Sequence, residues 1–317
     1  MIKTNMLTIK TLVENTSSKP NIMAEWGLSI LVDTGKKKVL FDTGSGYPQV
    51  LLHNMDVNGI SVTDIDVLVI SHGHQDHTGG LRPFFERLHS ISPDKTLEVI
   101  CHPGALDTQY IKDIGGFGCP YTQEELTRLG ARFRTITEPY AIDDDIYVSG
   151  TIPMTNGYES TGMIFFRKQG SRYASSDTPV NKDELGFNPA GEVFVQDTEV
   201  IDDMCLILNT DLGAIVFLGC GHRGMINSID YAKSILKSDN VYMVIGGTHL
   251  TGATDVRMNE TLRALDDAKV QKVGVSHCTG QVSAAKLYNA LGRDRFFFNL
   301  AGSVLRFTNG KLETKEF

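Results

Sequence analysis

The sequence has few cysteines and no long apolar run, and both absences narrow the class of protein. Only five of the 317 residues are cysteine, and none forms a C-x-x-C pair. An odd number of cysteines in a chain of this length favours free thiols in a reducing compartment. No apolar stretch approaches the ~20 residues that span a membrane, and residues 1–20 lack the apolar run of a signal peptide. We therefore expect a cytoplasmic protein without membrane partners.

The sequence also lacks a surplus of basic residues. It contains 30 Lys and Arg against 38 Asp and Glu, which gives a net charge of −8. Non-specific nucleic-acid binding needs a basic face for phosphate contacts, so this class of partner is not expected. Apolar residues make up 41% and charged residues 21%, a balance typical of globular proteins. We expect a small-molecule partner, and the sequence predicts no oligomeric state.

Apolar runs of strand length alternate with helical patterns along most of the chain. We expect strands at 7–13, 27–32, 38–41, 67–70, 97–101, 205–209, 214–218, 241–245, 272–276, 296–298 and 304–307. We expect helices at 49–54, 81–89, 122–129, 225–236, 260–268 and 283–291. In both halves of the chain, predicted strands are followed by predicted helices. This order predicts an α/β (α+β) fold with a single domain, 1–317, built as a four-layer αββα sandwich.

Residues 150–203 differ from the rest of the chain. Gly, Ser, Pro and Asn are frequent there and periodicity is weak, so we expect a loop-rich insertion or lid within the domain. The segment is locally basic, with aromatic residues nearby: Arg167, Lys168, Arg172 and Lys182 among Tyr158, Phe165, Phe166 and Tyr173. Such residues would suit a flat anionic ligand. The alternative is a solvated loop with a small apolar anchor.

Residues 71–80 read SHGHQDHTGG and follow the predicted strand at 67–70. Imidazoles and a carboxylate crowded at the end of a strand indicate a metal site. His222, His249 and His277 also follow predicted strands, and successive gaps of 27 and 28 residues separate them. Each gap is about one strand-helix-strand unit, and such units place successive strand ends side by side. We therefore expect these histidines at the same edge as the first cluster.

This arrangement resembles the metallo-β-lactamase superfamily. The resemblance covers nearly the whole chain, from the turn at Asp42-Thr43-Gly44 through the H-x-H-x-D-H loop to the three later histidines. The stretches SHGHQDHTGGL (71–81), GCGH (219–222), GGTHL (246–250) and SHCTG (276–280) are similar to one subgroup. That subgroup includes the 7,8-dihydropterin-6-methyl-4-(β-D-ribofuranosyl)aminobenzene 5′-phosphate synthases.

The resemblance implies one or two divalent metal ions, with zinc favoured and iron or manganese as alternatives. It implies two sets of ligands: His72, His74 and His222 for one metal, and Asp76, His77 and His277 for the other. The superfamily places a bridging acid at the strand end that His249 occupies here. A neutral imidazole cannot bridge two cations, so we expect His249 either to bind one metal or to act on the substrate. Asp76 is then an alternative general base.

Four further positions each allow two interpretations. The resemblance makes Asp42 a residue that orients a ligand histidine, and the alternative is a turn aspartate that caps backbone N–H groups. Arg223 precedes a predicted helix and is a candidate phosphate ligand, or else a solvated surface residue. His102 either lines the pocket or is an ordinary loop residue. Cys220 and Cys278, which flank candidate ligands, are either thiolate ligands or small packed residues.

Three functions follow from these expectations. The first is a metal-dependent hydrolase in which metal-bound hydroxide attacks a small anionic substrate, such as a phosphate ester, thioester or lactone. The second, implied by the resemblance, is a transferase that condenses a dihydropterin-methyl pyrophosphate with an arylamine ribose phosphate. The third is a metal- or ligand-binding protein without turnover. An RNase-like role is disfavoured by the net charge of −8.

Overall fold

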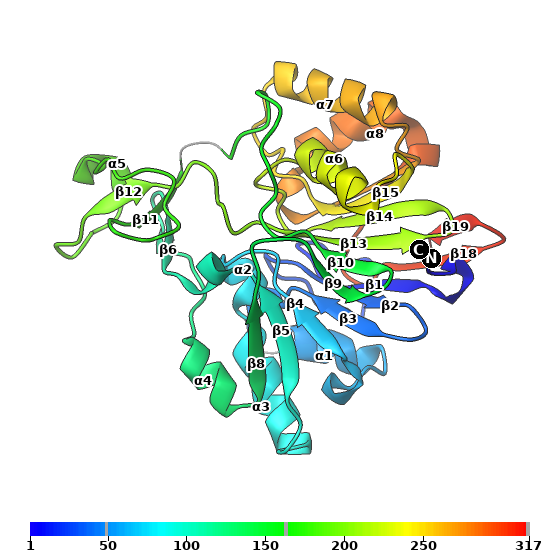
Figure 1. Cartoon of the computed structure of the whole chain (residues 1–317), viewed down its shortest axis with the longest axis horizontal. Coiled ribbons are helices and arrows are strands. Elements are labelled where there is room, and N and C mark those ends of the chain that lie inside the picture. Colours follow the sequence, from blue (N-terminus) through cyan, green and yellow to red (C-terminus); the bar gives the residue numbers. More distant parts are fainter. Residues whose placement is uncertain (48–49, 162–163, 315–317) are drawn as a thin grey trace.

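The computed structural model describes residues 1–47, 50–161 and 164–314, and its centre is a pair of stacked sheets (Figure 1). The first sheet has eight strands in the order β19-β18-β1-β2-β3-β4-β5-β8. In chain order these are β1 (Thr8–Val13), β2 (Ser29–Asp33), β3 (Lys38–Phe41), β4 (Val67–Val69), β5 (Leu97–Cys101), β8 (Ala131–Thr135), β18 (Val304–Thr308) and β19 (Lys311–Thr314). Strands β3, β4, β5 and β8 run parallel, so their carboxyl ends share one edge.

The second sheet has seven strands in the order β17-β16-β15-β14-β13-β10-β9. These are β9 (Tyr140–Asp143), β10 (Ile146–Val148), β13 (Cys205–Thr210), β14 (Gly213–Leu218), β15 (Val241–Gly247), β16 (Lys272–Ser276) and β17 (Phe296–Phe298). Strands β14 to β17 are parallel. The expectation that their carboxyl ends lie side by side is therefore confirmed.

Helices cover the outer face of each sheet (Figure 1). Beside the first sheet lie α1 (Val50–Val57), α3 (Leu81–Ile91) and α4 (Gln123–Arg128), and beside the second lie α6 (Met225–Leu236), α7 (Asp255–Asp267) and α8 (Gln281–Arg295). One apolar cluster fills the space between the sheets, and a further cluster lies under each helical layer. The predicted αββα sandwich is thus confirmed.

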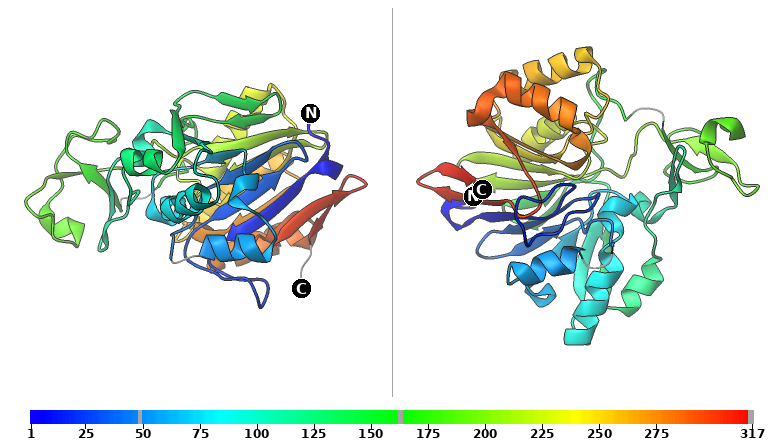
Figure 2. Two further views of the ribbon diagram at one scale, coloured as in Figure 1. Left: turned by 90° about the horizontal axis from the view of Figure 1, so that it is seen from below. Right: turned by 180° about the vertical axis from the view of Figure 1, so that it is seen from behind.

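A small third sheet projects from the sandwich (Figures 1 and 2). Its order is β12-β11-β6-β7, and it carries α5. The elements are β6 (Gln109–Ile111), β7 (Gly115–Gly116), β11 (Phe165–Lys168), α5 (Lys182–Leu185) and β12 (Phe194–Gln196). We call residues 109–116 together with 165–196 the projecting lobe. The sequence does not predict that β6 and β7 belong to this sheet, because only residues 150–203 have weak periodicity.

Four helices, α1, α3, α7 and α8, are longer than the sequence indicated, and the largest differences are in α7 and α8. We expected a helix at 260–268, but α7 begins at Asp255, where the side chain of Thr254 accepts from the backbone N–H of Arg257 and caps the helix. The last helix, expected at 283–291, extends to Arg295 across a non-helical Gly292.

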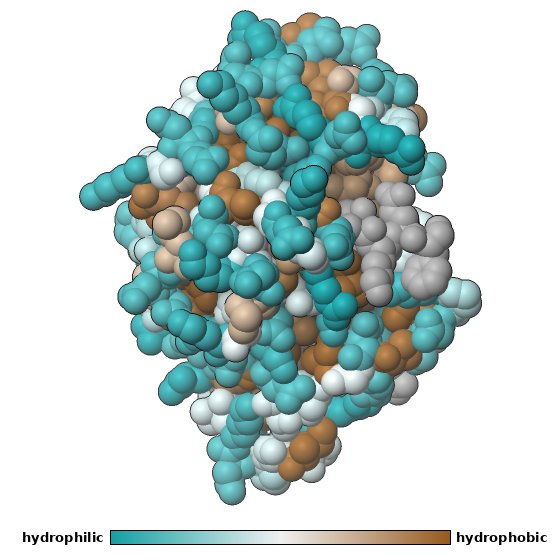
Figure 3. Space-filling model, turned by 90° about the vertical axis from the view of Figure 1, so that its right-hand side faces the viewer, coloured by the Kyte–Doolittle hydropathy of each residue, from teal (hydrophilic) through white to brown (hydrophobic). Residues whose placement is uncertain are grey.

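In the described part of the chain, no helix is long and apolar enough to cross a bilayer. The face beside the termini is mainly hydrophilic, with scattered apolar residues (Figure 3).

Candidate metal centre

Three histidines from two strand ends form the first half-site. His72 follows β4, His74 directly precedes the short helix α2 (Gln75–Thr78), and His222 follows β14. All three are buried. The Nε2 atom of His72 lies 3.0 Å from Nδ1 of His74 and 3.2 Å from Nε2 of His222.

His72 lies within metal-sharing distance of His74 and of His222, and the groups of possible ligands join it with His74 and Asp76, and with His222 and Cys220. Nitrogens at about 2.0–2.1 Å from a tetrahedral zinc lie ~3.3 Å from one another, close to the separations found here. Burial, reinforced by the neighbouring histidines, lowers the pKa of His72 and His222 well below the usual value. Burial also lowers the pKa of His74 to about 4. The imidazoles are therefore neutral near pH 7, which is the form that binds metals.

Asp76, His77 and His277 form the second half-site. Nε2 of His277 lies 3.0 Å from Oδ2 of Asp76, and Nε2 of His77 lies 3.8 Å from Oδ1 of Asp76. Within the described ranges, Oδ1 of Asp76 is buried without a hydrogen-bond partner. Burial opposes ionisation of Asp76, but the rings of His77 and His277 outweigh it and lower the pKa of this carboxyl. A second cation would satisfy these donors.

Asp42 holds both half-sites in place from the end of β3. Its carboxylate accepts from the backbone N–H and the hydroxyl of Ser71, each at 2.7 Å, and contacts Nδ1 of His77 at 2.7 Å. The backbone of Asp42 has a φ of +60°, a conformation that is uncommon for a residue with a Cβ atom. Burial lowers the pKa of His77, but Asp42 and Asp76 outweigh it and raise that pKa to about 9. This geometry matches the orienting role that the resemblance implies.

Cys220 and Asp76 each belong to two of the groups of possible metal ligands, whereas His249 lines the pocket beside them and its predicted role stays a prediction. Cys220 is the residue shared by a group with His72 and His222 and by a group with Asp76, His77 and His277. His249 belongs to none of the metal-binding groups found among the described residues. Instead, its Nε2 contacts the carbonyl oxygen of Thr161 at 3.1 Å. The sequence feature that could have indicated a role for Cys220 is its position, with His222, shortly after the apolar strand β14.

Two expected substrate contacts lie elsewhere. The guanidinium of Arg223 is buried and donates to the carbonyl oxygens of Ile152 and Glu199. His102 accepts from the backbone N–H of Gly104 through Nδ1, and its Nε2 lies 3.2 Å from the hydroxyl of Thr151. Neither residue lines the pocket beside the half-sites. Arg223 is thus neither solvated nor a pocket residue, and for His102 the loop interpretation fits the geometry.

Two of the four basic residues predicted in the insertion, Arg167 and Lys168, are held in ion pairs. Arg167 is fully buried, and it pairs with Asp197 at 2.6 Å and Asp202 at 2.5 Å. Asp202 also accepts from the backbone N–H of Gly73 at 2.8 Å. This ion-pair network ties β11 to the H-x-H-x-D-H loop. Arg167 therefore positions structure, and it does not bind an anion.

A pocket of about 590 Å³ opens onto both half-sites. Its walls combine donors from the sandwich with apolar side chains of the projecting lobe and residues beside it. The lining includes Trp26, Ile114, Phe117, Phe165 and His249. The ring of Phe165 stacks on His74 with centroids 4.8 Å apart, and the indole N–H of Trp26 donates to Oδ2 of Asp76 at 3.0 Å. The lobe therefore forms an apolar wall beside the metal ligands.

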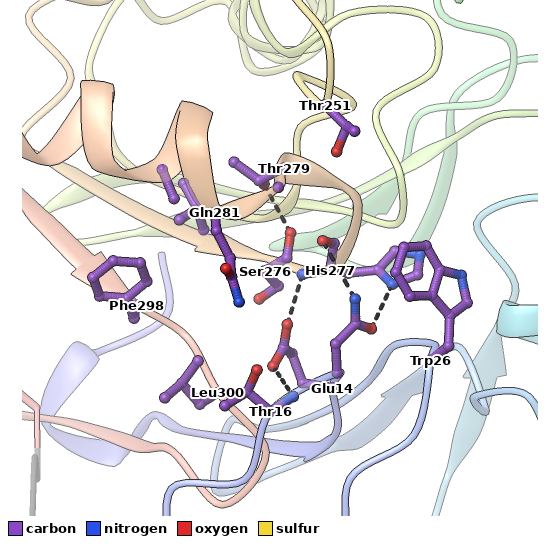
Figure 4. A pocket seen from close by; sticks show the side chains of 14 residues that line it. Glu14, Thr16, Trp26, Thr251, Ser276, His277, Thr279, Gln281, Phe298 and Leu300 are labelled. Carbon is purple, nitrogen blue, oxygen red and sulfur yellow. Dashed lines mark hydrogen bonds between the residues drawn. The ribbon is translucent and has the colours of Figure 1, made fainter.

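A second cavity of about 420 Å³ adjoins the first, and both are lined by Trp26, Thr251 and His277. Figure 4 shows that Glu14 fixes the backbone of His277 from this side. The Glu14 carboxylate accepts from the N–H groups of His277 and Thr16, each at 2.7 Å. His277 is thus held by its main chain as well as by its ring.

Comparison with known sequences agrees with this geometry. The family model of the metallo-beta-lactamase superfamily matches residues 27–89, which include the H-x-H-x-D-H loop. The 7,8-dihydropterin-6-methyl-4-(beta-D-ribofuranosyl)-aminobenzene-5′-phosphate synthase of Methanocaldococcus jannaschii is 27% identical, over 96% of this chain and 98% of its own length. An uncharacterised protein of the same organism is 33% identical, over 94% of this chain and 99% of its own.

Comparison with solved structures supports the same fold. The crystal structure of a metal-dependent hydrolase of the beta-lactamase superfamily superimposes with a TM-score of 0.68 at 23% identity. The match covers 96% of this chain and 100% of that one. A metallo-beta-lactamase fold protein of Bacillus subtilis, YhfI, has a TM-score of 0.53 at 13% identity, covering 94% and 98% of the two chains.

Proposed function

The chain belongs to the metallo-β-lactamase superfamily, and the relatives and fold neighbours named above include enzymes. We propose that it is a metal-dependent hydrolase of small anionic substrates of the phosphate or ester type. The proposal rests on one observation above all: three overlapping groups of possible metal ligands lie at a pocket whose opposite wall is apolar.

The donors suit divalent cations that prefer nitrogen, oxygen and sulfur, with zinc first and iron or manganese as alternatives. Such cations lower the pKa of bound water and polarise the bond to be cleaved. The chain's own residues hold and orient the centre. Asp42 fixes the ring of His77, Trp26 holds one oxygen of Asp76, and Phe165 covers His74 against solvent.

A guanidinium that contacts the segment leading into the pocket wall supports an anionic substrate. Arg257 donates from Nη1 to the carbonyl oxygen of Ser160 at 2.7 Å. Its Nε and Nη2 atoms are buried without a hydrogen-bond partner in the described ranges. The residue after Ser160 is Thr161, which lines the pocket. A guanidinium with free donors at this position suits a phosphate or carboxylate, the role first expected of Arg223.

A transferase is the second candidate. The relative of known activity is a synthase that carries a pterin in its name, and the aromatic residues Trp26, Phe117 and Phe165 in the pocket wall suit a flat ring. The two functions differ in what attacks the substrate. A hydrolase would release pyrophosphate from a dihydropterin-methyl pyrophosphate in water alone. A transferase would release it only when an arylamine ribose phosphate is also present.

His74→Ala tests the metal-dependent reaction, because it removes one donor of the first half-site. We expect the variant to lose at least one metal equivalent by elemental analysis and to lose detectable turnover. The readout for turnover is a screen of phosphate esters, thioesters, lactones and the two pterin reactions above. His89→Ala, on α3 and away from the pocket, is the matched control. Unchanged metal content in His74→Ala would remove the basis of the proposal.

A further inference from the structure

The cavity of about 420 Å³ beside the metal-binding edge has no role in the function proposed above. We propose that it receives an uncharged, ring-containing part of the substrate, while the anionic group of the same molecule lies at the metal-binding edge. This inference rests on the proposed function and deepens it, because it names a part of the substrate that the metal ligands themselves do not select.

The two cavities meet at a common wall. Trp26, Thr251 and His277 line both of them. The indole N–H of Trp26 donates to Oδ2 of Asp76 at 3.0 Å, and the indole ring lies edge-on to His277 with centroids 5.1 Å apart. Trp26 nevertheless keeps 56% of its surface exposed. A molecule held at the metal ligands can therefore extend along Trp26 into the second cavity.

Two exposed aromatic rings border the second cavity. Trp26 lies at one end, and Phe298 of β17 lies at the other (Figure 4). Phe298 is 48% exposed, and aromatic side chains left open at a concave site are typical of ligand contacts. Further apolar surface in the lining comes from Val275, Ala284 and Leu300. Small-molecule pockets span roughly 300–1,000 Å³, so this cavity is large enough for a ring with substituents.

The charges around the second cavity favour an uncharged group. Of its described lining residues, none is Lys or Arg, and Glu14 contributes a buried carboxylate that repels an anion. The N-terminus of α8 borders the cavity at Gly280 and Gln281, and a helix N-terminus disfavours a cation. Gln281 directs its neutral amide toward the cavity (Figure 4), where it can both donate and accept. An uncharged ring with polar substituents therefore fits this lining.

Binding of phosphonates tests the inference without turnover, because their C–P bond resists hydrolysis. The metal-loaded protein is titrated with methylphosphonate, with phenylalkylphosphonates of increasing chain length, and with the 4-carboxyphenyl counterparts of these compounds. Trp26 is the only tryptophan of the chain, so its fluorescence reports binding at the boundary of the two cavities. Elemental analysis confirms equal metal content in all samples.

The test variant is Phe298→Ala, and Tyr288→Ala is its matched control. Both rings are exposed and pack against Phe296, with centroids 5.0 and 5.8 Å away, so both substitutions remove a similar contact. Tyr288 lies on α8 and lines neither cavity. Phe165→Ala gives the comparison at the apolar wall of the first cavity. Circular dichroism confirms that each variant is folded.

We expect the best phenylalkylphosphonate to bind the wild type at least about 10-fold more tightly than methylphosphonate, because one molecule then occupies two joined sites. Phe298→Ala should lose most of this gain, Tyr288→Ala should keep it, and the 4-carboxyphenyl compounds should lack it. The inference would be overturned if the ring gave no gain, if only Phe165→Ala lost the gain, or if the carboxylated ring gave an equal gain. These results would leave the hydrolase proposal intact, since that proposal fails on a different measurement, the metal content of His74→Ala.

Discussion

The metal-binding edge of the sandwich and the junction of the projecting lobe both bury charged side chains, but they compensate them differently. At the junction, the buried Arg167 is paired with Asp197 and Asp202, so that the charges balance within the protein. At the edge, Asp76 faces two histidine rings and keeps one oxygen unpaired within the described ranges. The difference indicates that the junction serves architecture, whereas the edge is organised for cations from outside.

Substitution of Arg167 by Met should produce the largest effect on stability. It would leave Asp197 and Asp202 buried without their cation, and breaking a buried pair in this way costs about 3–5 kcal/mol. Chemical denaturation should therefore show a large loss in the free energy of unfolding. Because Asp202 also accepts from the N–H of Gly73, metal affinity should fall as well.

The control for Arg167→Met is the adjacent position on β11. Lys168 pairs with Glu192, and both side chains are more than 40% exposed. Such a surface pair contributes at most about 1 kcal/mol, so Lys168→Met should change stability little. If Arg167→Met and Lys168→Met lost the same free energy of unfolding, the stability of the junction would not depend on its buried ion pairs. The junction and the metal edge would then not differ in how they compensate buried charges.

Much of the sandwich could be predicted because its strands are apolar over their whole length. Val67–Val69 and Gly213–Leu218 are buried throughout, so the sequence carries their signal without ambiguity. The lobe could not be predicted in the same way. Its strand β7 has two residues, Gly115 and Gly116, and β6 pairs with β11 across more than fifty residues of chain. Pairings that distant leave no periodic pattern in a single sequence.

Substitution of Phe165 by Ala should affect substrate binding more than metal binding. Its ring forms part of the pocket wall beside His74, so its removal should raise KM by roughly 10-fold, which is about 1.4 kcal/mol. The bound metal should stay constant by elemental analysis. Steady-state kinetics on the best substrate from the screen would measure the change.

Phe166→Ala is the matched control for Phe165→Ala. Phe166 packs with Leu185 and Phe194 inside the lobe, so its loss should lower stability without a specific change in KM at temperatures where the protein is folded. If Phe165→Ala and Phe166→Ala give the same KM, the lobe would not select the substrate. The lobe would then contribute to the stability of the protein but not to substrate selection at the metal-binding edge.

The candidate site could be predicted to the level of residues but not of roles. The histidines at 72, 74, 77, 222 and 277 are brought together as their strand-end positions indicated. The hydrogen-bond partners of Arg223 and His249 could not be predicted, because they depend on which carbonyl groups lie nearby. Arg223 donates to Ile152 and His249 contacts Thr161, contacts between segments whose packing no local pattern reveals.

The smallest expected effect concerns Glu25, a buried carboxylate close to the metal edge that lacks the cation partner found at the lobe junction. Its oxygens accept from the backbone N–H groups of Ser45 and Tyr47. Burial raises the pKa of Glu25 to about 7, although these hydrogen bonds oppose the shift. In the unfolded chain the pKa is near 4.3, so folding favours the protonated form. The stability that this group contributes is full below that value and is lost as the pH rises through about 7.

Glu25→Gln removes this ionisation and preserves an oxygen acceptor. The melting temperature of the variant minus that of the wild type should therefore rise between pH 5 and pH 8, by roughly 2–4 °C. Thermal denaturation at equal metal loading measures the difference. Glu86→Gln, at an exposed ion pair on α3, should give a difference that is nearly independent of pH. If the difference in melting temperature for Glu25→Gln did not change with pH, the hydrogen bonds to Glu25 would fully compensate for the burial of its carboxylate. The metal edge would then resemble the lobe junction, where buried charges are compensated within the protein.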